Sequence, residues 1–201
     1  MAGAGKAADP PSHWVAAERW AAVVRDHGID EALRIYYTRY LPVGVPLLLA
    51  LGSLLGQLVV GGGWEKWPVH FRFGVLAMVI GCGIGGWIYT KKRMASRVEL
   101  GWGEVLIALN SSDKKAVLRQ IGGKAPVDRN RLVVARAVAV QQRWGIATGL
   151  LYVPCFLTVF GYGPGLRWTI PVGLLAVAAV YIMVRDFRRY GRFLRETAGL
   201  S

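Results

Sequence analysis

The composition of this 201-residue chain is not that of an ordinary soluble protein. Hydrophobic residues make up 54% of the chain and the mean hydropathy is +0.36, whereas a typical soluble domain is about 45–50% apolar. The formal net charge is +13, but the 25 Lys and Arg residues lie between and after apolar runs. That distribution is typical of cytoplasmic loops facing anionic lipid, so nucleic acid is not expected as a partner.

The first 12 residues are rich in Ala, Gly and Pro and are expected to be disordered. Ser12 is a typical N-cap residue, and it predicts a helix that runs to about His27 and stops at Gly28. One face of this helix is apolar, so it is expected either on the membrane surface or against other cytoplasmic segments, and the sequence favours neither. The apolar face consists of Ala16, Ala17, Trp20, Val23 and Val24.

A second short helix is predicted after Asp30, which has the side chain of a capping residue. Three tyrosines of this helix stand just before a long uncharged run, where an interfacial aromatic belt belongs. They are Tyr36, Tyr37 and Tyr40. Residues 13–39 are therefore predicted to form cytoplasmic amphipathic helices.

Residues 40–90 are predicted to form a transmembrane hairpin, with spans at about 41–61 and 69–89. About 20 apolar residues cross the hydrocarbon core of a bilayer, and both runs reach that length without a charge in the interior. His70 and Arg72 lie near the start of the second span, where their side chains are expected to reach the lipid headgroups.

The end of the second span fixes the orientation of the hairpin. Its uncharged run, from Phe73 to Tyr89, leads directly into Lys91, Lys92 and Arg93. A span that leaves the membrane on the cytoplasmic side typically ends in such a cationic cluster.

Residues 91–143 are predicted to form a basic, helical, cytoplasmic segment. Helices are expected at residues 95–110, 114–121 and 129–144. The last of these helices carries an arginine at every seventh position, so that three arginines share one face. This stripe, Arg129, Arg136 and Arg143, is interpreted as a surface for solvent, lipid headgroups or an acidic partner.

Residues 144–184 are predicted to form a second hairpin, with spans at about 144–160 and 168–184. Pro154 lies inside the first of these spans and is expected to kink it. The tail, residues 185–201, is basic and amphipathic, and contact with an anionic leaflet is its favoured interpretation. One arc of the tail consists of Arg185, Arg188, Arg189, Arg192 and Arg195, and the opposite arc of Phe187, Tyr190, Phe193 and Leu194.

The distribution of cations orients all four predicted spans. Of the 25 Lys and Arg residues, 22 lie before the first span, between the second and third, or after the fourth. Only Lys66, Arg72 and Arg167 lie toward the other side. Because cytoplasmic loops carry an excess of Lys and Arg, both termini are predicted to be cytoplasmic, in a protein of the cell membrane.

Three of the predicted spans contain glycine pairs four residues apart, which allow two helix backbones to approach closely. We interpret them as helix-packing positions within the chain or toward another chain. The pairs are Gly52 with Gly56, Gly81 with Gly85, and Gly145 with Gly149.

No residue pattern in the sequence predicts a catalytic site, a metal site or a bound cofactor. Carboxylates are sparse and the three histidines are far apart in the sequence. Cys82 and Cys155 each lie deep inside an apolar run, as small packing residues do.

The sequence therefore predicts an all-α integral membrane protein with four transmembrane helices in two hairpins and amphipathic cytoplasmic helices. The expected function is that of a non-catalytic binding, scaffold or accessory subunit, and the alternative is a small oligomeric transporter or channel subunit. Expected partners are anionic headgroups of the lipid bilayer and another membrane protein, in a homo- or hetero-oligomer. The residues expected to contact anionic lipid or a partner are Lys91, Lys92, Arg93, Arg129, Arg136, Arg143, Arg185, Arg188, Arg189 and Arg192.

Overall fold

A computed structural model of the chain describes residues 12–101, 103–161 and 166–200. Most of the N-terminal tail predicted to be disordered, and most of the connection between the predicted spans 144–160 and 168–184, lie outside these ranges. The chain divides into two compact units. We call residues 1–25, 99–143 and 188–201 the basic unit, and residues 26–98 and 144–187 the apolar unit.

In the apolar unit, one continuous helical segment leads from residue 29 to residue 60. It consists of α2 (Ile29–Ile35), a π-helical turn (Tyr36–Tyr40) and α3 (Leu41–Val60). Pro42 occupies the first turn of α3, directly after the π-helical turn, and it has no N–H to donate to the carbonyl groups of that turn. Gly61 ends the helix with a φ of 63°, a backbone conformation that glycine adopts without steric cost.

The capping of α2 differs from the prediction that Asp30 begins this helix. The carboxylate of Asp26 accepts hydrogen bonds from the backbone N–H groups of Gly28 and Ile29, at 2.9 and 3.1 Å. Gly28 precedes the helix with a φ of 115°, so the chain turns there and presents these N–H groups to Asp26. Asp30 lies inside the first turn instead.

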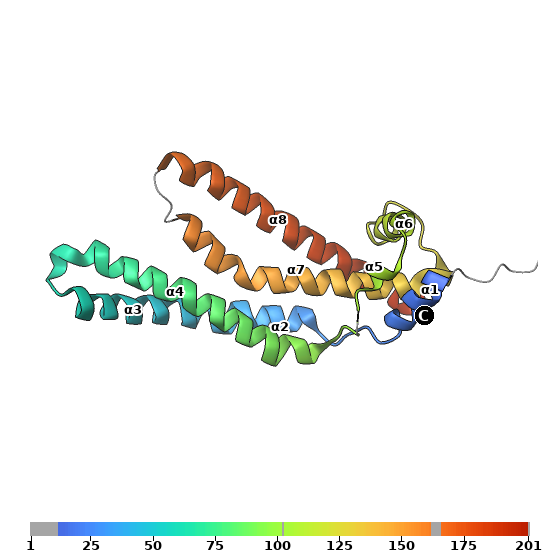
Figure 1. Ribbon diagram of the computed structural model, residues 1–201, viewed down its shortest axis with the longest axis horizontal. Coiled ribbons are helices and arrows are strands. Elements are labelled where there is room, and N and C mark those ends of the chain that lie inside the picture. Colours follow the sequence, from blue (N-terminus) through green and yellow to red (C-terminus); the bar gives the residue numbers. More distant parts are fainter. Residues whose placement is uncertain (1–11, 102, 162–165, 201) are drawn as a thin grey trace, which may run out of the picture. The chain divides into compact units, whose positions relative to one another are not determined.

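The second long helix of the apolar unit is α4 (Trp67–Tyr89), which continues into another π-helical turn (Thr90–Met94). A short 3-10 turn (Trp64–Lys66) connects it to α3, and the two helices lie side by side as an antiparallel hairpin (Figure 1). The apolar unit also contains the second part of α7 (Leu132–Gly161) and the first part of α8 (Leu166–Glu196).

The basic unit is built from shorter helices together with the remaining parts of α7 and α8. The short helices are α1 (Ser12–Ala21), α5 (Val105–Ala108), α6 (Ser111–Ile121) and two 3-10 turns (Arg129–Arg131 and Ala198–Leu200). The helices α1, α5 and α6 share one hydrophobic core with these parts of α7 and α8, and it includes Trp14, Val105, Val117, Val138 and Phe193.

Two predicted helix ranges were wrong. The first helix ends at Ala21 instead of about His27, because the chain becomes extended and residues 25–26 form β1 (Arg25–Asp26). Residues 95–110 do not form one helix. A 3-10 turn (Ala95–Arg97) is followed by β2 (Val98–Glu99), which pairs with β1, and only the four residues of α5 are α-helical. Gly101 lies between β2 and α5 and has a φ of 70°, a positive value that is incompatible with an α-helix.

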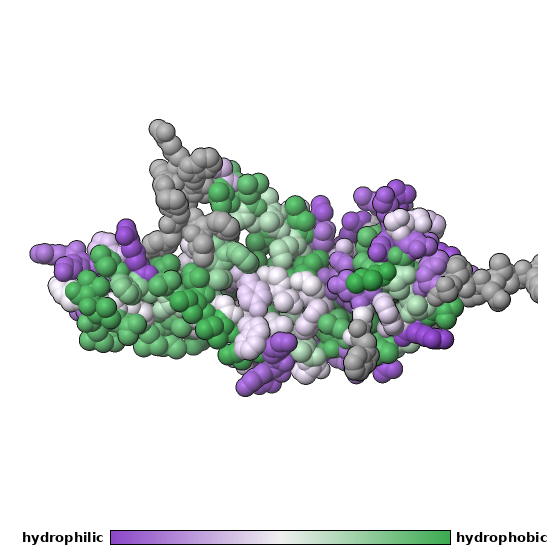
Figure 2. All heavy atoms as spheres, viewed as in Figure 1, coloured by the Kyte–Doolittle hydropathy of each residue, from purple (hydrophilic) through white to green (hydrophobic). Residues whose placement is uncertain are grey.

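The fold is all-α apart from these two short strands, as predicted. Within the described ranges, three helical segments are long and apolar enough to cross a membrane: residues Ile29–Val60, Trp67–Arg97 and Ile170–Glu196. They correspond to the first, second and fourth predicted spans. The third predicted span, 144–160, is not among these segments, although it is helical as the second part of α7. Hydrophobic residues cover the visible faces of α3 and α4 (Figure 2).

Candidate functional site

The basic unit buries the apolar faces of the two amphipathic helices that the sequence left open to membrane contact. Trp14 and Ala17 of α1 are 4% and 0% exposed, and Phe193 of the tail is 6% exposed. All three belong to the core that Val134 and Val138 of α7 also line. Of the predicted apolar face of the first helix, Ala17 is buried and Trp20 and Val24 pack partly against this core, whereas Val23 is 48% exposed. The structure therefore favours packing on protein over the membrane surface for α1.

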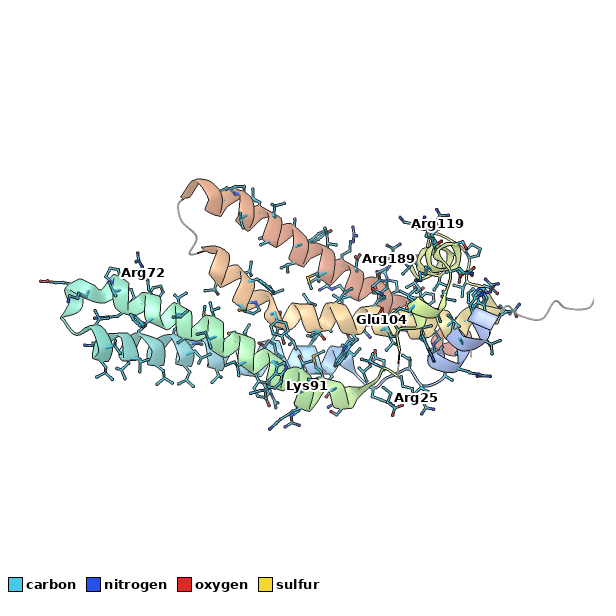
Figure 3. The ribbon with its side chains drawn as sticks, viewed as in Figure 1. Arg25, Arg72, Lys91, Glu104, Arg119 and Arg189 are labelled. Atoms are coloured by element: carbon cyan, nitrogen blue, oxygen red, sulfur yellow. The ribbon has the colours of Figure 1, made fainter. Side chains whose placement is uncertain are left out.

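Cations remain on the outside of this folded unit. In the described part of the basic unit, exposed Lys and Arg side chains outnumber exposed carboxylates. Figure 2 shows hydrophilic residues gathered over α6, and Figure 3 shows the Arg119 side chain directed away from that helix. The exposed cations are Arg19, Arg25, Lys115, Arg119, Lys124, Arg129, Arg188, Arg192 and Arg195.

Two of the predicted surface arginines instead lie against the helices of the basic unit. A Cβ added to Gly122 would stand 2.8 Å from a guanidinium nitrogen of Arg189, so this cation sits at the C-terminal end of α6. A cation is stabilised at a helix C-terminus by the partial negative charge of the last carbonyl groups. Figure 3 shows Arg189 on α8 near α6.

Arg143 does not share a surface with Arg129 and Arg136. Its side chain is only 5% exposed, whereas Arg129 is exposed and Arg136 is half-buried. A Cβ added to Gly191 would lie 3.1 Å from a guanidinium nitrogen of Arg143, so the absence of a side chain on α8 makes room for this arginine. The seven-residue spacing placed the three arginines on one helix face but could not show that α8 covers one end of it.

A polar cluster attaches α1 to the rest of the basic unit. The imidazole Nε2 of His13 lies 3.1 Å from a carboxylate oxygen of Asp113, in the first turn of α6. The guanidinium of Arg131 lies 4.0 Å from the same carboxylate and stacks over the Trp14 ring, with its central carbon 3.9 Å from the ring centroid. Such a cation–π contact stabilises the position of the indole. No sequence spacing revealed this cluster, because its members come from three separate segments.

Gln141 is a structural residue that no pattern in the sequence indicated. Its side-chain carbonyl accepts a hydrogen bond from the Val105 N–H at 2.9 Å, and its amide nitrogen donates to the carbonyl oxygens of Leu100 and Gly103 at 3.2 and 2.9 Å. One α7 side chain thus replaces the hydrogen bonds that the irregular segment before α5 cannot make with itself.

In the apolar unit, the first glycine pair lies where α3 and α4 approach closely. A Cβ added to Gly52 would stand 2.5 Å from Ala77 Cβ, and one added to Gly56 would stand 2.9 Å from Phe73 Cβ. Neither position has room for a larger residue, so glycine at both positions allows the backbones to approach.

The other two glycine pairs each have only one member at a close contact. A Cβ on Gly81 would stand 2.5 Å from a Leu48 methyl group, and one on Gly149 would stand 2.6 Å from the terminal methyl carbon of Met183. Within the described ranges, an added Cβ on Gly85 or on Gly145 would meet no atom within 4 Å. These two glycines therefore do not mediate helix packing inside the apolar unit.

Two of the three tyrosines predicted to form an interfacial belt turn into the protein. The hydroxyl groups of Tyr36 and Tyr37 donate to the carbonyl oxygens of Leu151 and Leu150, at 3.3 and 2.5 Å. These carbonyls belong to α7, three and four residues before Pro154, which cannot donate a backbone hydrogen bond. The Pro154 N would face Leu150, so the Tyr37 hydroxyl supplies the donor that this carbonyl lacks. Tyr40 remains exposed.

His70 is buried, which corrects the expectation that it reaches the headgroups beside Arg72. Its side chain is 8% exposed, and its Nε2 has no hydrogen-bond partner in the described part of the chain. Arg72 is exposed and directed away from α4 (Figure 3). His70 lines a cavity of about 250 Å³ with Ser53, Gln57 and Trp67, at the end of the hairpin where α3 meets α4.

The described residues contain no cluster of three or more His, Cys, Asp and Glu side chains that would hold a metal ion. Cys82 and Cys155 are both free thiols, and the Cys155 thiol donates to the Val79 carbonyl oxygen at 3.4 Å.

The candidate functional features of the described residues are the packed helices, the cation-rich basic unit and two cavities in the first hairpin. No protein-family model, curated protein or solved structure matches this chain.

Proposed function

We propose that this chain is a multi-pass membrane protein that serves as a non-catalytic scaffold or accessory subunit. Four helices cross the membrane as two hairpins, and both termini lie in the cytoplasm with the basic unit. The basic unit binds an acidic surface of a partner membrane protein and contacts the anionic headgroups around it. Three helical segments long and apolar enough to span support the membrane location, and the uncharged second part of α7 supports the fourth span.

The orientation follows from the placement of the cations. Each hairpin has one short connection between its two helices. Only three Lys and Arg residues lie in or beside these two connections, and they are Lys66, Arg72 and Arg167. Retention of cationic loops in the cytoplasm then orients every span. The connection between the hairpins is the basic segment itself, which is short enough for this rule to apply.

The observation that carries the scaffold function is the covered core of the basic unit. If α1 and the tail were separate amphipathic anchors, their apolar faces would be free to enter the lipid interface. In the structure the side chains of Trp14, Ala17 and Phe193 are buried together instead. A folded unit with a cationic exterior presents a fixed charged surface, and a fixed surface recognises a partner by charge complementarity.

Co-purification in a mild detergent tests this function. The full chain is expected to retain a stoichiometric membrane-protein partner, and replacing Arg188, Arg192 and Arg195 together with Gln is expected to release it. The matched control replaces Lys66 and Arg72 with Gln, which removes cations outside the basic unit and is expected to leave the partner bound. Equal retention by both variants would contradict the proposal.

A second function, that of a small transporter or channel subunit, is favoured by one observation. His70 is a buried ionisable side chain in a helix apolar enough to span, and it lines a cavity with the polar side chains of Ser53 and Gln57. Ionisable residues at such positions commonly mark solute or proton pathways. Flux measured in proteoliposomes, with Gln57→Leu as the variant and Arg72→Gln as the control, tests this second function.

A further inference from the structure

The first hairpin contains a second cavity, which is apolar and lies toward the end of α4 that carries the cationic cluster. Its volume is about 210 Å³, and it is partly open to its surroundings. Leu41, Val45 and Leu48 of α3 form one wall, and Gly81 and Gly85 of α4 contribute to the other. We call it the tyrosine groove, because the rings of Tyr36, Tyr40 and Tyr89 line it as well.

The groove exists because two glycines face it without being covered. In the described part of the chain, no atom lies within 4 Å of a Cβ added to Gly44 or to Gly85. Helices that pack only on each other place glycines at the contact, as Gly52 does in this hairpin. Gly44 and Gly85 instead leave open space along an apolar surface, which an additional apolar group can fill.

Both helices change their geometry at the tyrosine end of the groove. α2 passes into α3 through the π-helical turn Tyr36–Tyr40, and α4 ends in the π-helical turn Thr90–Met94. π-helical turns are rare in proteins, and those that occur are frequently found at functional sites. The Tyr89 ring contacts both of the other rings, with centroid distances of 5.2 Å to Tyr36 and 5.3 Å to Tyr40.

Cations continue the groove beyond its aromatic end. Gly81, Gly85 and Tyr89 recur every four residues on the groove side of α4, and the next position of that series is Arg93, which follows Lys92 directly in the chain. Both side chains are exposed, as is that of Lys91, which projects away from the helix in Figure 3. An apolar channel that ends in rings and then in cations matches the order of chain, interface and phosphate in a phospholipid.

We propose that the tyrosine groove binds one acyl chain of an anionic phospholipid, with the lipid phosphate held by Lys92 and Arg93. The stretch from Gly81 to Tyr89 rises about 12 Å, which an extended acyl chain covers over part of its length. This inference rests on the proposed function, because it places the groove in the cytoplasmic leaflet.

Selectivity for this lipid comes from charge and not from the acyl chain. Bulk lipid is as apolar as the groove, so moving a chain from one to the other provides little driving force. The groove fixes the position of one chain, and the cations then favour a headgroup with negative charge over a zwitterionic one. An acyl chain alone would give a site that holds all phospholipids equally.

Native mass spectrometry of the full chain tests the site. The protein is released from nanodiscs that contain equal amounts of phosphatidylglycerol and phosphatidylcholine with identical acyl chains, and the retained lipids are counted. One phosphatidylglycerol is expected per chain, and Lys92→Gln with Arg93→Gln is expected to lower its excess over phosphatidylcholine about thirtyfold. Gly85→Leu, which fills the groove without meeting another atom at Cβ, is expected to remove retention of either lipid.

The matched control for the groove is Gly83→Leu. Gly83 is also on α4 and has no atom within 4 Å of an added Cβ among the described residues, but it does not line the groove. This variant is expected to retain phosphatidylglycerol like the unchanged chain. A separate arm adds soluble glycerol phosphate, which is expected not to displace the lipid because it has no acyl chain.

Several outcomes would overturn the site. They are equal retention of the two lipids by the unchanged chain, no retention of either, unchanged retention by Gly85→Leu, or displacement by glycerol phosphate at concentrations comparable to that of the lipid. If the chain still inserts into nanodiscs and retains its protein partner, any one of these results would refute the lipid site and leave the proposed function standing. Failure of insertion would refute both.

Discussion

Replacement of Phe193 with Ala tests whether the tail is a structural part of the basic unit. The Phe193 ring is 6% exposed and shares a core with Trp14 and Val138. Transfer of a buried phenylalanine side chain to water costs about 1.5–3 kcal/mol, and the cavity left behind raises the total for Phe→Ala to about 3–5 kcal/mol. Against a domain stability of about 5–15 kcal/mol, this loss is large.

Amide hydrogen exchange in a membrane mimetic measures the effect locally, so that stability of the apolar unit does not mask it. Phe193→Ala is expected to reduce the protection of α6 amides by about 3 kcal/mol, since Val117 and Ile121 of α6 belong to the same core. Arg192→Ala, the neighbouring exposed position, is expected to change it by less than about 0.5 kcal/mol. If Phe193→Ala left α6 protection unchanged while weakening binding to lipid vesicles, the packing argument would be wrong.

Three further predictions follow from single contacts. Gly52→Ala is expected to destabilise the apolar unit by about 1–3 kcal/mol, because the new Cβ would stand 2.5 Å from Ala77 Cβ. Gly145→Ala is the control, since a Cβ there meets no described atom within 4 Å. Equal melting temperatures of the two variants in detergent would contradict the close packing at Gly52. His70→Leu removes a buried imidazole whose Nε2 has no hydrogen-bond partner among the described residues. It is expected to raise the stability of the hairpin by about 1 kcal/mol, and a lower melting temperature would contradict this. Arg131→Ala is expected to weaken protection of α1 amides by about 0.5–2 kcal/mol through loss of the Trp14 contact, and unchanged exchange would refute that contribution.

The long apolar helices were predictable because they depend on a local property of the sequence, whereas the cytoplasmic exit of α4 stays a prediction. A run of about 20 apolar residues has few alternatives to a spanning or buried helix, and Lys91–Arg93 follows the run directly. The ends of shorter elements were less predictable. Residues 95–110 were predicted as one helix continuing from the second span, but residues 98–99 are extended and pair with residues 25–26, and Gly101 follows with a φ of 70°.

Whether lipid or protein covers the apolar face of an amphipathic helix could not be predicted, because both environments favour the same spacing of apolar residues. The alternation of Phe193 and Arg192 in the tail predicts a helix with one apolar side, and either environment satisfies that side. The burial of Arg143 depends on the absence of a side chain at Gly191, 48 positions away in the sequence. The burial of His70 likewise depends on the α3 surface that it meets, so neither position carried a local signal.

The central claim is that four helices cross the membrane and keep the basic unit in the cytoplasm. Its most direct test is labelling of single cysteines, placed at Lys66, Lys115 or Arg167 in a chain with Cys82→Ala and Cys155→Ala, by a membrane-impermeant maleimide. The account predicts that cysteines at positions 66 and 167 react only from outside the cell, and that a cysteine at position 115 reacts only once the cytoplasmic side is accessible. Labelling of position 66 or 167 from the cytoplasmic side, or of position 115 in intact cells, would contradict it.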